Sequence, residues 1–478
     1  MSEFNTFTDF LVWIDGIVWG IPLIVLIMGT GIYLTVRLGV LQFRKLPKAL
    51  KYMVKNEEDG IGEVTSFGAL CTAMAATVGT GNIVGVATAV IAGGPGALFW
   101  MVLAACFGMA TKYSEGLLAV KFRVAKENGR FLGGPFYYIE NGMGSRWKWL
   151  AKLFAFFACG AGLLGIGTIT QVNGIASATK NFFDPDNEHM VSIFGTEYSW
   201  AIVISAIVVA VLTALVVIGG IKRIASVTTI VVPFMAIMYV GVCVVILVYN
   251  ADKIPYAVQE IFAGAFGLRA AAGGALGALM IAMQKGVARG IFSNESGLGS
   301  APIAAAAAQT REPVRQGLVS MTGTFIDTII ICAMTGLTIM VTGAYDFSIA
   351  NGLDGVDVTA VAFGNGLPWA PQMGGAVLMI ALAFFAFTTI LGWDYYSERS
   401  LEYLLNGNMK AVKVYRWLYI LAVLIGPFLT VSAVWTIADI FNACMAAPNL
   451  IALLALSGVV VKETRSYFKR LENGEIKG

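Results

Sequence analysis

The stretch Ala76–Val86, ATVGTGNIVGV, interrupts an apolar run that is long enough to cross a bilayer. Gly79, Gly81 and Gly85 each weaken a helix, and the threonine and asparagine side chains can take over hydrogen bonds that the backbone gives up. Within a membrane, such a break persists only where it is buried in protein or faces a watery cavity. The stretch therefore predicts a discontinuous membrane helix beside a functional site or a close helix contact.

The chain as a whole has the composition of a polytopic membrane protein. Of its 478 residues, 58% are hydrophobic and 13% are charged, and its mean hydropathy is +0.77. This balance excludes a water-soluble globular domain of this size. Because a bilayer core needs about 20 apolar residues per span, we predict an all-α protein with about 11 transmembrane helices. The predicted runs begin near Asp9, Ser66, Gly96, Leu150, Trp200, Ser226, Ala271, Gln316, Met373, Val412 and Trp435.

Lysine and arginine are distributed unevenly between the connections, and this predicts the orientation. The odd-numbered connections and the C-terminal tail are rich in these residues, whereas the even-numbered connections carry mostly acids. Because cytoplasmic loops collect lysine and arginine, we expect the N-terminus outside and the C-terminus in the cytoplasm. The opening MSEFNTFTDF has neither a basic region nor a cleavage pattern, so we expect the first run to be retained as a span.

Residues that carry enzymatic chemistry are sparse in the sequence. The six cysteines lie in apolar runs without metal-ligand spacing, which predicts free thiols. The one histidine, His189, falls in a predicted outside loop, and the spans hold no paired carboxylates. Hydrolytic and metal-dependent enzymes need a nucleophile beside a base or clustered ligands, so we predict that the protein is not an enzyme.

A second interruption lies in the seventh run, where GIFSNESGLGSAP spans Gly290–Pro302. The second run begins one set of five spans and the seventh begins the next, and because five is odd the second set must insert upside down. Secondary transporters are often built from such inverted repeats, with broken helices at corresponding positions forming the binding site. We therefore predict an accessory helix and cytoplasmic loop over residues 1–65, two five-helix repeats over 66–250 and 251–461, and a cytoplasmic tail over 462–478.

These interruptions have two other interpretations. Glycine-rich membrane segments often serve only close helix packing, and Gly81 with Gly85 fits the GxxxG pattern. Two such segments at matching positions, both with polar residues between the glycines, favour a site. A channel would need a continuous pore, often from several subunits, and the single-chain inverted repeat fits alternating access better.

Several stretches resemble the signatures of one family. ATVGTGNIVGVATAV, GGPGALFWM, GRFLGGPFYYIENG, KGVARGIFSNESGLGSAPIAAAAA and TTILGWDYY are similar to motifs of the alanine/glycine:cation symporters, which are sodium-coupled carriers of small amino acids in prokaryotic membranes. The resemblance covers nearly the whole chain. It implies a LeuT-type 5+5 core with one extra N-terminal helix in a prokaryotic plasma membrane, and alanine or glycine as the substrate.

The resemblance also implies a sodium site. Val78-Gly79-x-Gly81-Asn82 is similar to the unwound part of the first core helix in neurotransmitter-type symporters. In that register, the backbone carbonyls of Ala75 and Val78 and the hydroxyls of Thr388 and Thr389 occupy the positions of the shared sodium site. The implied partners are Na⁺, a small amino acid and the lipid bilayer, without nucleic acid; the oligomeric state stays open.

An amino acid arrives as a zwitterion and must exchange its hydration for protein contacts. Free amides at the start of a half-helix favour a carboxylate, and free carbonyls at the end of a half-helix favour an ammonium group or a hard cation. We therefore expect the two breaks to supply most of the substrate site. The predicted substrate-binding residues are Gly79, Thr80, Gly81, Asn82, Gln171, Phe292, Ser293, Asn294 and Trp393.

Two of these residues also have a structural interpretation. A lone membrane glutamine such as Gln171 is about as often interhelical glue as a ligand, and the family resemblance favours a ligand. Trp393 lies one helical turn after Thr389 and could form a wall of the pocket, or it could belong to the interfacial belt of aromatic residues.

Further charges within the spans leave the coupling ion open. Glu295 could pair with Arg289 or Lys285 and hold the broken seventh run together, and Asp327 could be a proton site or a partner of those bases. The adjacent threonines favour sodium, whereas an essential titrating Asp327 or Glu295 would favour proton coupling.

Overall fold

The predicted helical architecture is confirmed by a computed structural model of the chain, which describes residues 7–55, 57, 60–126, 129–193, 195–267, 274–369, 371–429 and 432–476. Nine helical segments in this part of the chain are long and apolar enough to cross a membrane. The two halves of the second run add a tenth span, and helix α14 (Ala275–Asn294) supplies the eleventh. The predicted start of the seventh run at Ala271 lies outside the described residues.

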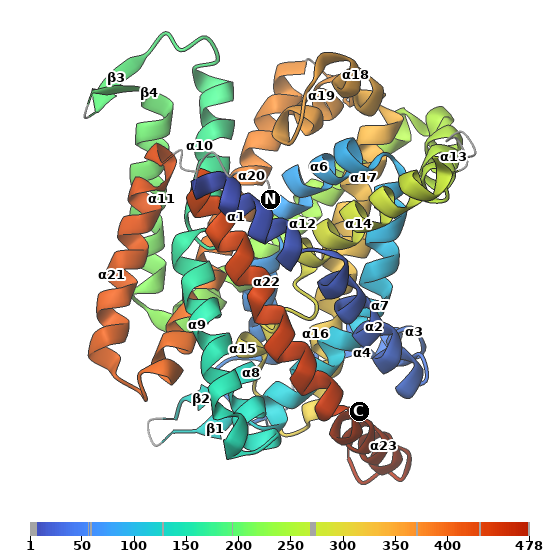
Figure 1. The fold of residues 1–478 in the computed structure, drawn as a ribbon, viewed down its shortest axis with the longest axis vertical. Helices are drawn as coiled ribbons and strands as arrows, with labels where there is room; N and C mark the ends of the chain where they lie inside the picture. Colours follow the sequence, from blue (N-terminus) through green and yellow to red (C-terminus); the bar gives the residue numbers. More distant parts are fainter. Residues whose placement is uncertain are drawn as a thin grey trace.

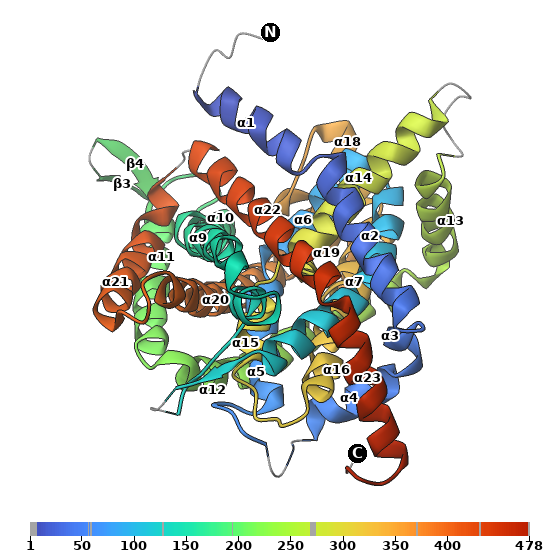
Figure 2. The ribbon, with the colours of Figure 1, turned by 60° about the horizontal axis from the view of Figure 1, so that its bottom comes forward.

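The first run forms an elbow and not a single straight helix. Helix α1 (Phe7–Val18) ends before Gly20, and helix α2 (Ile21–Arg37) begins with a proline in its first turn. Proline is favoured at this position because its missing N–H would have no helical partner there. Both helices pack against α22, with α2 also contacting α7, so the accessory segment lies along the outside of the core (Figure 2).

The first repeat contains five spans around a broken helix. Helix α5 (Ser66–Thr77) and α6 (Val84–Gly93) form the broken span, with a 3₁₀ turn, η1 (Thr80–Asn82), between them. The other four spans are α7 (Gly96–Lys121), α9–α10 (Lys148–Leu164 and Ile169–Phe183), α11 (Trp200–Val217) and α12 (Gly220–Tyr249).

The second repeat has the same order of elements. Helix α14 and the short α15 (Ala301–Ala305) form its broken span. The following spans are α16–α17 (Pro313–Thr324 and Ala333–Val341) joined by a π-helical segment, η5 (Phe325–Cys332), then α20 (Pro371–Leu404), α21 (Met409–Ile425) and α22 (Ser432–Ala455). Figure 1 shows how these helices surround the two broken spans.

The fourth run, predicted as an apolar span beginning near Leu150, contains an interruption. Residues 165–168 interrupt it between α9 and α10, and an added Cβ at Gly167 would lie 2.5 Å from the Cβ of Trp393. The hydroxyl of Tyr419 donates to the Gly167 carbonyl over 2.7 Å, which satisfies a backbone group that the helix leaves free. Close packing on α20 therefore explains why this break contains glycines.

The connections divide the molecule into two faces. What we call the C-terminal face carries α3 (Leu41–Arg44), α4 (Leu46–Val54), β1 (Val124–Ala125), β2 (Phe131–Leu132), α8 (Pro135–Tyr137), η2 (Tyr138–Gly142), η3 (Ser145–Trp147) and α23 (Ser457–Glu472). The opposite face carries β3 (Met190–Ile193), β4 (Thr196–Ser199), η4 (Ala251–Lys253), α13 (Ile254–Ala265), α18 (Ala344–Asn351), α19 (Val356–Gly366) and η6 (Gly426–Phe428).

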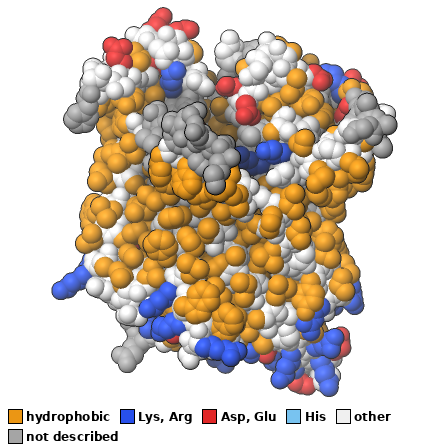
Figure 3. All heavy atoms as spheres, viewed as in Figure 1, with side chains coloured by type: hydrophobic (Ala, Val, Ile, Leu, Met, Phe, Trp, Pro, Cys, Tyr) orange, Lys and Arg blue, Asp and Glu red, His pale blue; other side chains and the backbone are white. Residues whose placement is uncertain are grey.

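The surface between these faces is apolar. Figure 3 shows a wide hydrophobic band around the helices, with lysine and arginine gathered along the edge that carries the C-terminus and with acidic groups at the other end. All six cysteines are free thiols, as predicted.

Candidate substrate and ion site at the broken helices

The first break is held by polar side chains that accept from its backbone. The Gly79 N–H donates to Asn82 Oδ1 over 2.9 Å, and the Thr80 N–H donates to Gln171 Oε1 over 3.4 Å. The Asn82 N–H donates to the Gly79 carbonyl over 3.2 Å. Three of the four amides that were predicted to be free for a carboxylate therefore have partners already.

The fourth amide, that of Gly81, is in a different position. Among the described turn, loop and side-chain hydrogen bonds around this break, none uses its N–H. A Cβ added at Gly81 would lie 3.5 Å from the ring of Phe292, which comes from the other broken helix. Gly81 and Phe292, both predicted from the sequence, thus lie side by side where the two repeats meet.

The backbone of the second break contains three residues with positive φ. Helix α14 ends at Asn294, and Glu295 follows in a left-handed conformation with φ of 55°. Gly297 and Gly299 also have positive φ, at 93° and 84°, a conformation that favours glycine. The chain therefore turns sharply before α15 begins at Ala301.

Ser293 and Asn294 point toward the π-helical segment η5. The Ser293 hydroxyl donates to Asp327 Oδ2 over 2.8 Å, and Asn294 Nδ2 donates to Thr328 Oγ1 over 3.0 Å. All four residues are buried. These bonds give the two predicted substrate residues an intramolecular role in this conformation.

Asp327 connects the two breaks directly. Its Oδ1 accepts from Asn82 Nδ2 over 2.7 Å, while its Oδ2 accepts from Ser293 and from Thr328. The residue is fully buried and belongs to η5. π-Helical turns often occur at functional sites. Sequence analysis singled out Asp327 but not its partners, because the π-helical turn leaves no clear signal in the pattern.

The predicted pairing of Glu295 with Arg289 or Lys285 is wrong. Glu295 accepts from Trp393 Nε1 over 3.0 Å and from the Ser300 hydroxyl. Arg289 and Lys285 instead line a separate cavity of about 180 Å³ together with Asp15 and Asp439. Helical spacing placed the bases near the break but did not give the direction in which they point.

Two charged residues of α7 that sequence analysis missed complete the second break. Lys112 Nζ donates to the carbonyl of Asn294 over 2.9 Å, at the C-terminal end of α14. Glu115 Oε1 accepts from the Gly297 N–H over 3.1 Å and from Asn449 Nδ2 over 2.6 Å. A cation at a helix C-terminus and an anion at free amides are both favourable. Two charges within the apolar third run, in the stretch TKYSEG, were the available signal.

Trp393 is fully buried, so the interfacial alternative for this residue is wrong. It lies on the same helix as Thr389, as expected, but its indole N–H binds Glu295 in the second break. Trp393 therefore links α20 to the second repeat's broken helix.

Of the predicted sodium-site residues, the structure brings Val78 and Thr389 together, whereas the Thr388 hydroxyl lies 3.5 Å from Met235 Sδ on α12. Thr389 Oγ1 is 3.5 Å from the Val78 carbonyl oxygen and donates to the Phe385 carbonyl over 3.0 Å. The hydroxyl of Thr388 also lies 3.0 Å from the Phe385 carbonyl. Ala75 is buried in the same part of α5, and a Cβ at Gly392 would lie 2.7 Å from the Ala76 backbone, which shows how closely α5 and α20 approach.

This donor set fits a hard monovalent cation. Carbonyl and hydroxyl oxygens are the ligands that hard cations prefer. The Phe385 carbonyl is an oxygen that sequence analysis did not name. An added Cβ at Gly79 would lie 2.5 Å from Thr389 Oγ1, so Thr389, a predicted sodium ligand, packs directly against the first break.

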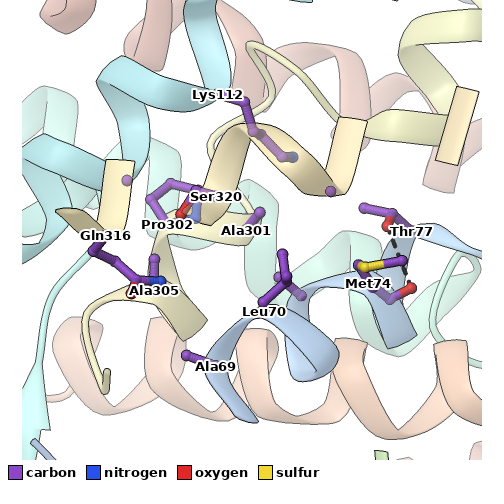
Figure 4. A pocket seen from close by; sticks show the side chains of 13 residues that line it. Ala69, Leu70, Met74, Thr77, Lys112, Ala301, Pro302, Ala305, Gln316 and Ser320 are labelled. Atoms are coloured by element: carbon purple, nitrogen blue, oxygen red, sulfur yellow. Dashed lines mark hydrogen bonds between the residues drawn. The ribbon is translucent and has the colours of Figure 1, made fainter. Parts of the chain in front are cut away.

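The cavities on the two sides of the first break differ greatly in volume. Toward the opposite face lies a cavity of about 620 Å³ whose lining includes Thr80, Thr170, Asn173 and Ser177. Toward the C-terminal face, side chains of α5, α7, α15 and α16 close around a cavity of about 10 Å³ (Figure 4). Among the described residues, the large cavity therefore reaches the first break from the side of the opposite face, and the small cavity lies toward the C-terminal face.

The chain is similar over nearly its whole length to known proteins of one family. The model of a family described as the sodium:alanine symporter family matches residues 4–477. The chain is 46% identical over 468 residues to a Methanococcus maripaludis protein named sodium/alanine symporter AgcS, which covers 97% of this chain and 98% of that protein. It is 36% identical over 481 residues to a Bacillus subtilis protein named putative sodium/proton-dependent alanine carrier protein YrbD, covering 98% and 93%.

The fold has a counterpart among solved structures. A crystal structure of MhsT in complex with L-phenylalanine aligns with a TM-score of 0.52 at 13% sequence identity, covering 84% of this chain and 98% of that chain. The fold is thus the LeuT-type inverted repeat. On the family match over nearly its full length, the chain belongs to the sodium:alanine symporter family, whose members are transporters and not enzymes.

Proposed function

We propose that this protein carries small neutral amino acids, alanine or glycine, into the cell together with sodium by alternating access. One observation carries the proposal. Thr389 Oγ1 lies 3.5 Å from the Val78 carbonyl oxygen and occupies the space that a side chain at Gly79 would need. An ion bound by Val78 and Thr389 would fix the first break against α20. The substrate site and the ion site would then share the same few residues of backbone.

The substrate would bind at the first break, reached through the large cavity. The Gly81 N–H is the available donor for its carboxylate, and helix amides of this kind favour anions. The amides of Gly79, Thr80 and Asn82 would join if Asn82 and Gln171 released them. Phe292, packed beside Gly81, would limit the size of the substrate's side chain.

The other predicted substrate residues would have to change partners to reach a ligand. Ser293 and Asn294 would leave Asp327 and Thr328, and Trp393 would leave Glu295. They stay predicted substrate residues on the family resemblance. Ala75 and Thr388 likewise stay predicted sodium ligands.

The proposed orientation places the C-terminal face in the cytoplasm of a prokaryotic cell and the N-terminus outside. Lysine and arginine gather on that face, as cytoplasmic loops require (Figure 3). The 620 Å³ cavity then opens toward the outside, so this conformation is the one that accepts substrate from the medium.

Coupling would follow from the contact between the two sites. Sodium between α5 and α20 stabilises the position of the Gly79–Asn82 turn, and a bound substrate stabilises the same turn. Ion and substrate would raise each other's affinity reciprocally, with a coupling free energy of typically about 1–3 kcal/mol.

The deciding experiment is uptake of labelled alanine into proteoliposomes that contain the purified protein. An inward sodium gradient at equal pH on both sides should drive accumulation, whereas an inward proton gradient without sodium should not. Undiminished uptake after sodium is replaced by choline would contradict the proposal.

A second candidate is proton coupling on the same fold, and Asp327 favours it. This buried carboxylate is bonded to both breaks, so a change in its charge would act on both. Under this mechanism, Asp327→Asn would abolish proton-driven accumulation but keep alanine exchange across the membrane. Accumulation driven by sodium alone in the wild type would exclude it.

A further inference from the structure

The C-terminal-face ends of the two broken helices are joined by backbone pairing. The segment before α5 and the segment after α15 form a parallel bridge between Val64 and Ala308. The Glu63 N–H donates to the Ala307 carbonyl over 2.8 Å, and the Gln309 N–H donates to the Val64 carbonyl over 2.7 Å. Since α5 begins at Ser66 and α15 ends at Ala305, this bridge holds the two half-helices at their ends.

Arg123, just past the end of α7, binds both sides of this bridge. Its Nη1 donates to the carbonyls of Ala306 and Ala308 over 3.0 and 2.7 Å. Its Nη2 donates to the carbonyls of Ile61 and Thr310, each over 2.7 Å. One guanidinium therefore satisfies four backbone oxygens from two segments about 245 residues apart, a task that needs its planar fork of donors.

Neighbouring side chains stabilise the Arg123 guanidinium in this position. The Arg123 guanidinium lies 4.7 Å from the centre of the Phe131 ring, a favourable cation–π distance. Burial lowers the pKa of Arg123 to about 10, with Glu57 opposing that shift, so the group is charged at neutral pH. Glu57 also accepts from the Thr310 hydroxyl over 2.6 Å and from the Arg311 N–H over 3.0 Å.

The approach of the two segments depends on small residues. A Cβ added at Gly62 would lie 2.3 Å from the Ala308 carbonyl oxygen, and one at Gly60 would lie 2.4 Å from that of Gln309. Any side chain at these positions would push the segments apart. The bridge can therefore be opened in two independent ways, by removing the guanidinium or by adding a methyl group.

We propose that Arg123 is a positioning residue of the transport cycle, which latches α5 to α15 on the C-terminal face while the opposite face is open. The inference rests on the alternating access proposed above. In this mechanism, opening toward the C-terminal face separates the ends of α5 and α15, so the four hydrogen bonds of Arg123 break once per cycle. The latch sets the balance between the two conformations and touches neither substrate nor ion.

The experiment measures access to the 10 Å³ cavity from the C-terminal face. Ser320 lines that cavity, so Ser320→Cys is introduced and its labelling by a membrane-impermeant maleimide is followed in vesicles of each orientation. Labelling of the protein with its native cysteines alone is subtracted. Arg123→Gln should speed the labelling from the C-terminal face by about tenfold or more, because loss of charge-assisted bonds shifts the population. Arg123→Lys should give an intermediate rate.

Lys121→Gln is the matched control. Lys121 lies two residues away on the same face and pairs with Glu463 in a partly exposed salt bridge, so its loss should leave the rate unchanged. Arg123→Gln should also lower uptake while alanine binding changes much less, a split that a general loss of folding would not produce.

Unchanged labelling in a folded Arg123→Gln protein would overturn the proposal. If that variant does not fold, Gly62→Ala opens the same bridge with the guanidinium intact, and unchanged labelling in Gly62→Ala would overturn it equally. The readout needs no sodium gradient. Failure of sodium coupling, seen in wild-type uptake, is therefore distinguishable from failure of the latch.

Discussion

The two broken helices occupy equivalent positions in the inverted repeat but are held in different ways. Around the first break, the neutral side chains of Asn82 and Gln171 accept from the backbone, one carboxylate, that of Asp327, binds the far side of Asn82, and Thr80 borders a large cavity. Around the second, the charged side chains of Lys112, Glu115 and Glu295 are all buried. Neutral hydrogen bonds can be exchanged for a ligand at small cost, whereas breaking a buried charged network is expensive. This difference agrees with the proposal that the first break binds the substrate, and it suits the second break to structural support.

The largest expected effect comes from removing a charge at the second break. Lys112→Met should lower the free energy of unfolding by about 3 kcal/mol, because it leaves the buried Asn294 carbonyl without its charged donor and removes the positive charge near Glu115 and Glu295. Thermal unfolding of the detergent-solubilised protein measures this. Lys121→Met, on the same helix but partly exposed, should cost no more than about 0.5 kcal/mol. Equal stability of Lys112→Met and wild type would remove the distinction between the two breaks.

The next effect tests the packing of the first break. The methyl group of Gly79→Ala would lie 2.5 Å from Thr389 Oγ1 and 3.3 Å from Gln171 Oε1. Overpacking of this kind costs about 1–3 kcal/mol, and we expect it to appear as lost alanine uptake with the fold retained. Gly85→Ala is the control, since nothing lies within 4 Å of its added Cβ. Similar uptake by the two variants would show that the break tolerates displacement.

The smallest expected effect is on the sodium dependence of uptake. Thr389→Ala should raise the sodium concentration for half-maximal uptake by about tenfold, the equivalent of about 1.4 kcal/mol. Thr389→Ser keeps the hydroxyl and should behave nearly as wild type. Sodium activation curves of alanine uptake measure both. A wild-type sodium dependence in Thr389→Ala would place the ion elsewhere and weaken the link between the first break and coupling.

Much of the architecture could be predicted from the sequence because it depends on local patterns. Apolar runs gave the spans, and Gly79, Gly81, Gly297 and Gly299 marked the two breaks. The spacing of five spans between them predicted the inverted repeat. The approach of Val78 to Thr389 came from the family resemblance and not from spacing.

Side-chain directions could not be predicted in the same way. Whether Glu295 meets Arg289 or Trp393 depends on how two helices are rotated against each other, which no local pattern encodes. The π-helical turn around Asp327 and the interruption at Gly167 likewise arise from packing against other spans. Lys112 and Glu115 carried a readable signal, because charges within an apolar run need partners.

Helix α7 connects features at two depths of the molecule. Lys112 and Glu115 bind the second break near its middle, and Arg123, eleven residues after Lys112, holds the bridge beyond its end. From Lys112 to the end of α7 at Lys121, a rise of 1.5 Å per residue gives about 14 Å, or two and a half helical turns. If α7 stays rigid, a shift of the second break along its axis would displace the Arg123 end of the helix as well. The helix would then behave as a rigid rod, which moves both ends together without changing its own shape.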